Sequence, residues 1–532
     1  MSGISKLKSY MKSKIIKASI VFLAIASGAA LWSFITDAKF ESSHSSGKKP
    51  NVVIILADDL GYHDLSSYGN TLINTPNIDA LGKEGVKFNQ GYVSAAYCSP
   101  SRAGLLTGRY QQRFGSEFIV GSAATWGIEN ADKAKISQVS AWLNKFDVVF
   151  DKDLDVKKFS EIKQGLPLQE ITIAELLRER GYKTGWIGKW HLGEGGDLIP
   201  SKQGFDYSYG ILGGGTTYGA ASDPQLISRH LSHLFWDKSV FKEKRSGWGA
   251  VQQNGKETEV KEYLTTRFGN EAADFIEKNK DNPFFLYLAF NAPHDPVQAK
   301  KTDFDLLTSI KDSTQRAYQA QVKSLDDAVG VVTSKLKELN LDNNTIVIFL
   351  SDNGGATYTH ILDNKPLRAG KATNFEGGIR VPFFIKYPAL IKGGIDFDQP
   401  VSSLDFFTTI AAATEASLPN DVSYDGVNLI PYLNGEKKER PHESLFWRVG
   451  FAKAVRKGDY KLYINEKENQ TLLFDLKNDV SESHNLASTN KEKVEELKQE
   501  LIKWENSVQP PRWPSVMYMK YNNNGEFNYF PI

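Results

Sequence analysis

The run Asn-Val-Val-Ile-Ile-Leu-Ala-Asp-Asp-Leu-Gly, residues 51–61, decides which kind of fold this chain adopts. Its apolar, β-branched first part is typical of a strand buried on both faces of a parallel sheet. Asp58 and Asp59 follow directly, at the carboxyl end of that strand, where ligands bind in open α/β sheets. Two adjacent carboxylates are also common in a solvated turn, so the pair alone does not define a site.

Three further strands are predicted to end in polar groups in the same way. These groups are Lys189 and His191 after strand 182–187, His294 after strand 283–290, and Asp352 with Asn353 after strand 345–350. In an extended segment with a period of two, Lys189 and His191 point to the same side. One such strand end would be unremarkable, but four on one sheet predict a common site.

The order of these strands and the helices between them predicts the fold class. Amphipathic helices are expected at 169–181 and 314–339, so the chain is predicted to be α/β, with a large, mainly parallel central sheet flanked by helices. The pattern changes near the C-terminus. Three short alternating segments separated by turn residues predict a small antiparallel sheet, and a helix at 491–504 would pack on it.

The predicted domains follow from this change and from the N-terminus. Five lysines between residues 6 and 17 precede an apolar run at 18–34 that contains small residues. This pattern predicts a signal peptide and an exported protein, periplasmic or secreted. An uncleaved membrane anchor is the alternative, because the run approaches the ~18 residues of a spanning helix. The predicted divisions are a signal peptide at 1–36, a linker at 37–50, an α/β domain at 51–440 and an α+β subdomain at 441–532.

The net charge of +1 over 532 residues gives no reason to expect a nucleic-acid partner. Cys98 is the only cysteine, which excludes an internal disulfide. Pro100 suits the start of a helix, Ser99 could cap it, and Gly108 could end it. Cys98 would then lie near a helix N-terminus, which favours negative charge. A buried, inert thiol is the alternative interpretation.

The candidate site combines hard oxygen donors with cations. Three carboxylates and an amide, from Asp58, Asp59, Asp352 and Asn353, suit Ca²⁺ or Mg²⁺ rather than Zn²⁺. Carboxylates close together repel one another unless a cation neutralises them. The surrounding cationic or titratable residues are Arg102, Lys189, His191, His294 and Lys371. A metal ion with several cations can hold charge that develops on ester oxygens during bond cleavage.

The motif Cys-x-Pro-Ser-Arg at 98–102, followed by Leu-Thr-Gly-Arg at 106–109, resembles the signature of the type I sulfatases, in the alkaline phosphatase superfamily. Other segments match the family and occur in its order. They are Gly-Lys-Trp-His-Leu-Gly at 188–193, Pro-His-Asp-Pro at 293–296, Ser-Asp-Asn-Gly-Gly at 351–355, and Gly-Lys-x-x-x-x-Glu-Gly-Gly-Ile-Arg-Val-Pro at 370–382. The resemblance covers nearly the whole mature chain and implies an alkaline-phosphatase-like fold and a sulfuric ester hydrolase.

The resemblance also implies roles for the site residues. Cys98 would be oxidised to formylglycine by a formylglycine-generating or maturase enzyme, and the hydrated aldehyde would be the nucleophile. Ca²⁺, with Mg²⁺ less favoured, would be held by this diol with Asp58, Asp59, Asp352 and Asn353. Arg102 would polarise the diol, and Lys189 and Lys371 would bind sulfate oxygens. His191 would take a proton from the second hydroxyl of the diol. His294 would contact the sulfate and, with Lys371, protonate the leaving alcohol.

The substrate is less clearly indicated than the reaction. His63 stands where the family often has glycine, so it either contacts the substrate or is a tolerated surface residue. The insertion at 118–165 is unusually long. Export and abundant Trp and Tyr favour a sulfated polysaccharide or its oligosaccharides: an algal galactan, ulvan or glycosaminoglycan. The alternatives are small aryl sulfates, a phosphomonoester or phosphonate hydrolase of the same superfamily, and an inactive carbohydrate-binding scaffold.

Overall fold

The computed structural model describes residues 48–121, 133–143, 145, 148–150, 162–193, 195–234, 236–513, 515, 517–523 and 526–531. Residues 49–532 belong to one compact unit. The predicted signal peptide at 1–36 lies outside the described residues, as do most of the linker at 37–50 and much of the insertion at 118–165. Within the described ranges, no helix has the length and apolar character needed to cross a membrane.

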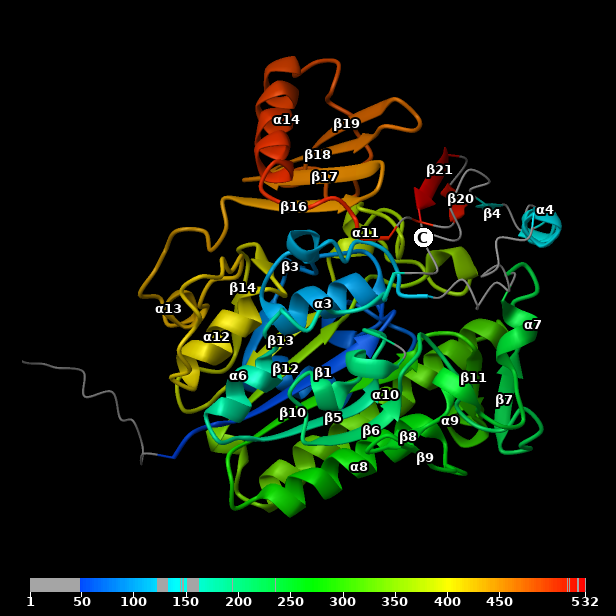
Figure 1. The fold of residues 1–532 in the computed structure, drawn as a ribbon, viewed down its shortest axis with the longest axis vertical. Helices are drawn as coiled ribbons and strands as arrows, with labels where there is room; N and C mark the ends of the chain where they lie inside the picture. Colours follow the sequence, from blue (N-terminus) through cyan, green and yellow to red (C-terminus); the bar gives the residue numbers. More distant parts are fainter. Residues whose placement is uncertain are drawn as a thin grey trace, which may run out of the picture. The chain divides into compact units, whose positions relative to one another are not determined.

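A ten-stranded, mostly parallel sheet forms the centre of the described part of the chain (Figure 1). Its strands are β1 (Asn51–Asp58), β2 (Val86–Phe88), β5 (Lys183–Lys189), β6 (Tyr207–Ile211), β8 (Gln252–Gln253), β9 (Lys256–Glu257), β10 (Phe284–Pro293), β12 (Thr345–Ser351), β13 (Phe383–Lys386) and β14 (Ile395–Phe397). They lie in the order β14-β2-β13-β12-β1-β10-β5-β6-β8-β9. The sheet confirms the predicted α/β class, and β1 pairs in parallel with both β10 and β12.

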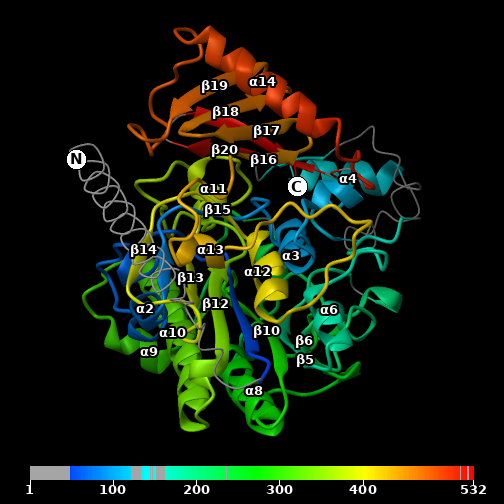
Figure 2. The same ribbon diagram turned by 90° about the vertical axis from the view of Figure 1, so that its left-hand side faces the viewer.

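Alternate residues of β1 face opposite sides of the sheet, and both sides are covered by helices. Val52, Ile54 and Leu56 belong to a core shared with α3 (Cys98–Thr107), α6 (Ile173–Glu179) and α12 (Asp405–Ala413). Val53, Ile55 and Ala57 belong to a second core, shared with α2 (Pro76–Glu84), α8 (Leu264–Asn279) and α10 (Ser313–Glu338). Figures 1 and 2 show the two helix layers on opposite sides of the strands. Burial on both faces explains why β1 is continuously apolar.

Helix α6 is shorter than the predicted helix at 169–181, because a capping box fixes its start. The hydroxyl of Thr172 accepts the backbone N–H of Glu175, and the Glu175 carboxylate accepts the backbone N–H of Thr172. The helix therefore begins at Ile173.

The C-terminal part contains the predicted antiparallel sheet, with one strand more than predicted. Its strands are β16 (Ser444–Val449), β17 (Ala452–Lys457), β18 (Tyr460–Asn465) and β19 (Gln470–Asp475). Helix α14 (Lys491–Glu505) packs on it through Leu497, Leu501 and Trp504 (Figure 1). The boundary at residue 440 stays a prediction.

Smaller elements complete the described chain. The helices are α4 (Lys133–Leu143), α7 (Asp237–Val240), α9 (Lys301–Leu306), α11 (Glu376–Ile379) and α13 (Ile430–Leu433). The strands are β3 (Gly91–Tyr92), β4 (Val148–Phe150), β7 (Leu226–Arg229), β11 (Val297–Lys300), β15 (Val401–Ser402), β20 (Met517–Asn523) and β21 (Glu526–Pro531). Strand β4 of the insertion pairs with β20, so the insertion joins a hairpin from the C-terminal end of the chain.

A fully buried ionic cluster ties the C-terminal sheet to the α/β part. The Lys461 ammonium on β18 lies 3.0 Å from the Glu376 carboxylate and 2.9 Å from the Glu482 carboxylate. The second oxygen of Glu482 accepts the backbone N–H of Glu376 at 2.7 Å. Because Glu376 opens α11, five residues after Lys371, this cluster fixes one end of the loop that carries Lys371.

Candidate active site

Four neighbouring strands bring the predicted polar residues to one edge of the sheet. Strands β12, β1, β10 and β5 are adjacent and parallel, so their carboxyl ends meet. Asp58 ends β1 and Lys189 ends β5, while His294 and Asp352 each follow their strand directly. The sequence-predicted convergence of strand ends is therefore present in the structure.

Asp58 is fully buried between two cations. The Lys189 ammonium lies 2.9 and 2.7 Å from its two oxygens, and the Arg102 guanidinium lies 3.2 Å from one of them. Burial alone would raise the pKa of Asp58, but the charge of Lys189, with smaller contributions from His294, Arg102 and Lys371, lowers it well below its usual value. Asp58 is thus held as a carboxylate.

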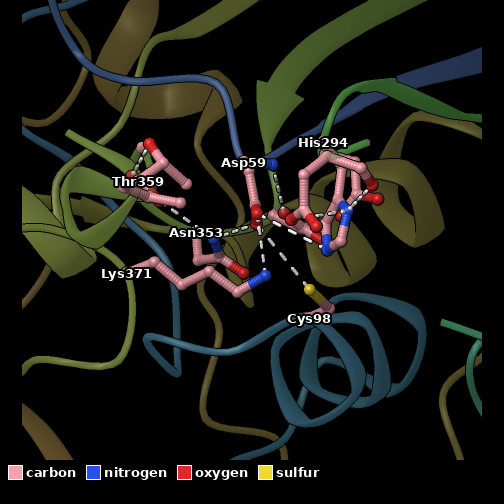
Figure 3. Close-up of polar contacts among 12 residues, drawn as sticks. Asp59, Cys98, His294, Asn353, Thr359 and Lys371 are labelled. Atoms are coloured by element: carbon pink, nitrogen blue, oxygen red, sulfur yellow. Dashed lines mark hydrogen bonds and ion pairs between the residues drawn. The ribbon is translucent and has the colours of Figure 1, made fainter. Parts of the chain in front are cut away.

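Asp59 lies at the centre of the cluster, as Figure 3 shows. One of its oxygens lies 2.7 Å from the Lys371 ammonium and 3.6 Å from Nε2 of His294. The other accepts the side-chain amide N–H of Asn353 at 2.8 Å. The imidazole of His294 is oriented by its Nδ1, which donates to the backbone oxygen of Asp295 at 2.6 Å and leaves Nε2 facing the cluster.

Asp352 pairs with Arg102, which donates to it through Nε at 2.9 Å and lies 2.8 Å away through Nη2. Its other oxygen accepts the backbone N–H of Asp59 at 3.2 Å. Burial and the nearby charge of Asp58 raise the pKa of Asp352 to about 6. Asp352 therefore connects the loop after β12 to the loop after β1 and to helix α3.

Cys98 is the first residue of α3, one turn before Arg102, and its side chain is 1% exposed. Its thiol lies 3.8 Å from an oxygen of Asp59 and can donate to it. Burial raises the pKa of the thiol. The predicted Ser99 cap is wrong, because the Ser99 hydroxyl accepts the backbone N–H of Val120.

The predicted end of α3 is confirmed. The helix ends at Thr107, and Gly108 follows in a left-handed conformation with φ 66°. Together with the start at Cys98, this makes α3 a short, completely buried helix. The thiol and the guanidinium of Arg102 are therefore held on one rigid element.

The backbone at His191 is not extended, contrary to the prediction that His191 and Lys189 lie two residues apart on one extended segment. Its φ is 58°, so the chain turns after β5 and the period of two does not extend to it. Its Nδ1 is buried and has no hydrogen-bond partner among the described residues. Burial, with the charges of Lys189 and Arg102, lowers the pKa of His191 well below 6.5. A neutral imidazole in this place can accept a proton.

His63 is not brought into the cluster. Its imidazole packs against Gly69, so closely that a Cβ added to Gly69 would lie 2.4 Å from Nε2. Gly69 itself has φ 105° and closes a short turn. His63 was expected either to contact the substrate or to be a tolerated surface residue, and this packing against Gly69 favours the second interpretation.

Two positioning residues have no obvious signal in the sequence. The Asn364 amide donates to the backbone oxygens of Gly355, Ala369 and Gly377, at 3.1, 2.9 and 3.2 Å. It therefore connects the loop after β12 to the loop that carries Lys371. The Ser351 hydroxyl accepts the backbone N–H of Leu60 at 2.9 Å and so fixes the turn after Asp59. The Ser351 contact crosses 291 residues, and the Asn364 contacts depend on the path of the loop between Gly355 and Gly377, so local patterns do not reveal either one.

The residues present fit a hard divalent cation. Ligand atoms from Asp58, Asp59, Cys98 and His294 all lie within 4.8 Å of one another. The amide oxygen of Asn353 is buried and has no hydrogen-bond partner among the described residues, as expected of a group that serves as a ligand. A donor set dominated by carboxylate and amide oxygens suits Ca²⁺ or Mg²⁺.

Comparisons with known proteins identify the family of this chain. Residues 50–416 match the Sulfatase family, and residues 370–507 match the family of the N-sulphoglucosamine sulphohydrolase C-terminal region. Steryl-sulfatase of Rattus norvegicus is 33% identical over 459 residues, covering 75% of this chain and 73% of its own. N-acetylgalactosamine-6-sulfatase of the same organism is 33% identical over 422 residues, covering 78% and 71%.

A solved structure extends the comparison to the fold. The crystal structure of Ps i-CgsB has a TM-score of 0.73 and 34% identity, and the match covers 88% of this chain and 95% of that one. The same protein has been crystallised in complex with k-i-k-neocarrahexaose. With a family match over residues 50–416, the chain belongs to the sulfatase family and is a sulfuric ester hydrolase.

Proposed function

We propose that this enzyme hydrolyses sulfate esters of a sulfated polysaccharide or its oligosaccharides, with a formylglycine made from Cys98 and a bound Ca²⁺ ion. The observation that carries the proposal is the position of the Cys98 thiol, 3.8 Å from Asp59 among side chains whose ligand atoms lie within 4.8 Å of one another. A thiol placed only for packing would not need three buried cations beside three carboxylates.

Formylglycine, once formed and hydrated, supplies an oxygen nucleophile for attack on the sulfur of the ester. Arg102 is positioned to orient this group, because it lies one helical turn from Cys98 and is itself fixed by Asp58 and Asp352. Since Arg102 is fully buried, its charge acts without screening by water. The buried helix α3 thus holds nucleophile and cation in fixed relation.

The sulfate group is bound by Lys189 and Lys371 in this proposal. Both ammoniums are buried, that of Lys189 against Asp58 and that of Lys371 against Asp59. Negative charge that grows on the sulfate oxygens and on the leaving oxygen is stabilised by these fixed charges. Burial alone would lower the pKa of Lys371, but the charge of Asp59 raises it well above its usual value, so Lys371 stays cationic.

In this proposal, the two histidines transfer the protons. His191, whose lowered pKa keeps it neutral, takes the proton when sulfate is released. His294 presents Nε2 towards Asp59 and, with Lys371, protonates the leaving alcohol. Opposite roles for two imidazoles require different environments, and only His191 is surrounded mainly by cations.

Ca²⁺ in this proposal is held by the carboxylates of Asp58, Asp59 and Asp352 and by the amide oxygen of Asn353, with the group made from Cys98. Ca²⁺ accepts six to eight oxygen ligands in flexible geometry, whereas Mg²⁺ requires a near-ideal octahedron and keeps several waters. A cluster of three carboxylates on two loops suits the larger ion better. When bound, the cation polarises the reacting oxygens and offsets the repulsion between the carboxylates.

We propose a sulfated algal galactan as the substrate class, ahead of ulvan and the glycosaminoglycans. Support comes from the structural relative crystallised with k-i-k-neocarrahexaose, by its name a carrageenan-type galactan oligosaccharide. Its 34% identity extends over 88% of this chain. We also propose that the enzyme is exported, on the strength of the basic and apolar N-terminal pattern, and that a maturase or formylglycine-generating enzyme converts Cys98.

The test is a desulfation assay with enzyme produced alongside a formylglycine-generating enzyme. Sulfated galactan, ulvan and glycosaminoglycan oligosaccharides, 4-nitrophenyl sulfate and 4-nitrophenyl phosphate serve as substrates. We expect sulfate release from the galactan, and an aldehyde at residue 98 by peptide mass spectrometry. Cys98→Ala should lower turnover by about 10⁴-fold or more, because it removes the nucleophile. Full activity of Cys98→Ala, or faster release of phosphate than of sulfate, would contradict the proposal.

A further inference from the structure

We infer that the indole of Trp248 is a stacking platform for a sugar ring of the substrate, next to the bound sulfate ester. The inference rests on the proposed function and deepens it, because it assigns a saccharide-binding subsite. Three observations carry it: the contact of the indole with a run of glycines, the contact of that run with the two site histidines, and the exposure of the indole.

The indole lies directly on the backbone of Gly213. A Cβ added to Gly213 would lie 2.0 Å from Cε3 of Trp248, closer than any side chain allows. The backbone N–H of Gly213 donates to the backbone oxygen of Trp248 at 2.9 Å, so the two segments are also joined by a hydrogen bond. Glycine at this position is what allows the ring to pack so closely.

The next two glycines lie against the active site. A Cβ added to Gly214 would lie 2.8 Å from Nε2 of His191, and one added to Gly215 would lie 3.8 Å from Cε1 of His294. Consecutive Cα atoms are about 3.8 Å apart, so the indole contact and the His294 contact are separated by at most ~8 Å of backbone. That span is close to the size of one or two sugar rings. The platform therefore lies within reach of a saccharide whose sulfate is at the cluster.

The indole is exposed although it is large and apolar. Its exposed fraction is 43%, and among the described residues with large exposed apolar side chains it is the one aromatic. The others are Leu72, Val149, Leu168, Leu306, Val331 and Ile502. Isolated exposed aliphatic residues are normal on protein surfaces, but an exposed tryptophan packed on a glycine run that contacts two site histidines offers a ring face to a ligand.

The backbone that carries the platform is held by hydrogen bonds. Arg245 donates to the backbone oxygens of Thr217 and Tyr218 at 2.8 and 2.6 Å, and so fixes the end of the glycine run. The Trp248 turn is anchored at the other end through Gly213. A ring carried on a backbone that is already ordered requires less ordering of the chain on binding, which favours affinity.

The surroundings of the indole favour a sugar over a sterol. Gly214, Gly215 and Thr216 are half-buried, and the Thr216 hydroxyl lies 3.4 Å from where a Cβ of Gly249, the residue after Trp248, would stand. A polyhydroxylated ring can place its C–H face on the indole and its hydroxyls against these groups. A sterol would instead require a largely closed apolar surface on both sides.

The experiment compares one large and one small substrate. In wild type and Trp248→Ala, kcat and KM are measured for k-i-k-neocarrahexaose and for 4-nitrophenyl sulfate. We expect the ratio of kcat/KM for the hexasaccharide to that for the small ester to fall about 10-fold, as a ring contact of this kind implies, mainly through KM of the hexasaccharide. Trp248→Phe should restore most of the ratio, because it keeps an aromatic face. Ile502→Ala on α14, with a side chain exposed to a similar extent (40%), should leave the ratio unchanged.

The outcomes separate this inference from the proposed function. If wild type cleaves both esters and Trp248→Ala leaves the ratio unchanged, the platform is overturned and the sulfatase proposal stands. Equal losses on both substrates would also overturn it, because they would indicate a structural role. A steryl sulfate is assayed in the same way, and if Trp248→Ala lowers kcat/KM for it while kcat/KM for the hexasaccharide is unaffected, the ring belongs to a different ligand and the sugar subsite is overturned. Cleavage of the small ester but not of the hexasaccharide by wild type would overturn the proposed substrate and the platform with it.

Discussion

At the scale of single residues, the site stores backbone strain where its chemistry is concentrated. Asp59 and His191 adopt the left-handed conformation, with φ 62° and 58°. This conformation is uncommon for residues other than glycine and persists when the surroundings enforce it. The left-handed conformation of Asp59 is held by the hydrogen bond from its backbone N–H to the Asp352 carboxylate. That of His191 is held by the hydrogen bond from its backbone N–H to the backbone oxygen of Leu212. Both side chains are thereby directed away from the path that an extended strand would give them.

Removal of divalent cations is predicted to affect activity and stability together. The carboxylates of Asp58, Asp59 and Asp352 are buried within one cluster, so an ion bound there stabilises the folded state over the unfolded one. We expect a chelator followed by dialysis to lower the melting temperature and to reduce turnover. Ca²⁺ should restore both at lower concentration than Mg²⁺. Unchanged melting and turnover after chelation would contradict an oxygen-ligated ion at this site.

The residues that could be predicted from the sequence are those whose signal is local. Asp58, Asp59, Asp352 and Asn353 were found because each follows an apolar strand directly. Asn364 and Trp248 were not found, since their importance depends on contacts with segments that only folding brings close. The glycines at 213–215, and those on either side of Trp248, were the one available hint, because such runs often mark close approach of the backbone.

At the scale of elements, Asp405 shows how one side chain fixes a helix and two loops. It begins α12, and its oxygens accept the backbone N–H groups of Ser402 and Val427 at 2.7 and 2.8 Å. The Nε2 atom of His442 lies 2.7 Å from the same carboxylate. Burial alone would lower the pKa of His442, but the charge of Asp405 outweighs it and raises that pKa above 6.5.

The His442 contact predicts a pH-dependent contribution to stability. Because the pKa of His442 is higher in the folded state than in the unfolded state, the protonated imidazole stabilises the fold. This contribution is fully present below pH 6.5 and is lost as pH rises through the raised folded-state pKa. In urea unfolding, the free energy of unfolding of wild type should therefore exceed that of His442→Asn by more at pH 6 than at pH 9. A constant difference, or one that grows with pH, would contradict the assignment.

The elements that could be predicted best are those buried on both faces. Strands β1, β10 and β12 are continuous apolar runs, because helices cover both sides of them. Strand β6, with the sequence Tyr-Ser-Tyr-Gly-Ile, has no such run and was not predicted. The start of α6 was misplaced although its capping box, Thr172 to Glu175, is visible in the sequence.

At the scale of the whole molecule, the cluster of Lys461, Glu376 and Glu482 links the C-terminal sheet to the catalytic loop. Burial and the charge of Glu376 oppose ionisation of Glu482, and its pKa is raised to about 7. The charge of Lys461 is what makes two buried carboxylates tolerable here. The C-terminal sheet therefore contributes to the position of Lys371 without contacting the reacting atoms.

Lys461→Met is predicted to destabilise the enzyme by about 3–5 kcal/mol, because it leaves the buried Glu482 carboxylate without its cation and takes one cation from Glu376, whose other oxygen keeps Arg380 at 3.6 Å. Urea unfolding measures this loss. Turnover should fall as well, since the loop of Lys371 loses one anchor. Glu482→Gln, which keeps the size of the side chain and removes one negative charge, should lower the free energy of unfolding much less. Equal losses for the two variants would argue against a charge effect.

The burial of Cys98 also sets an order of events in the life of the protein. At 1% exposure, the thiol is covered by the finished fold. In the proposed conversion of Cys98 to formylglycine, the modifying enzyme would therefore have to bind this segment while the polypeptide is still unfolded. A chain that folded before this modification would be stable but would keep an unmodified Cys98 and stay inactive. Under this proposal, the yield of active enzyme depends on the relative rates of folding and of modification, and slower folding during synthesis would raise that yield.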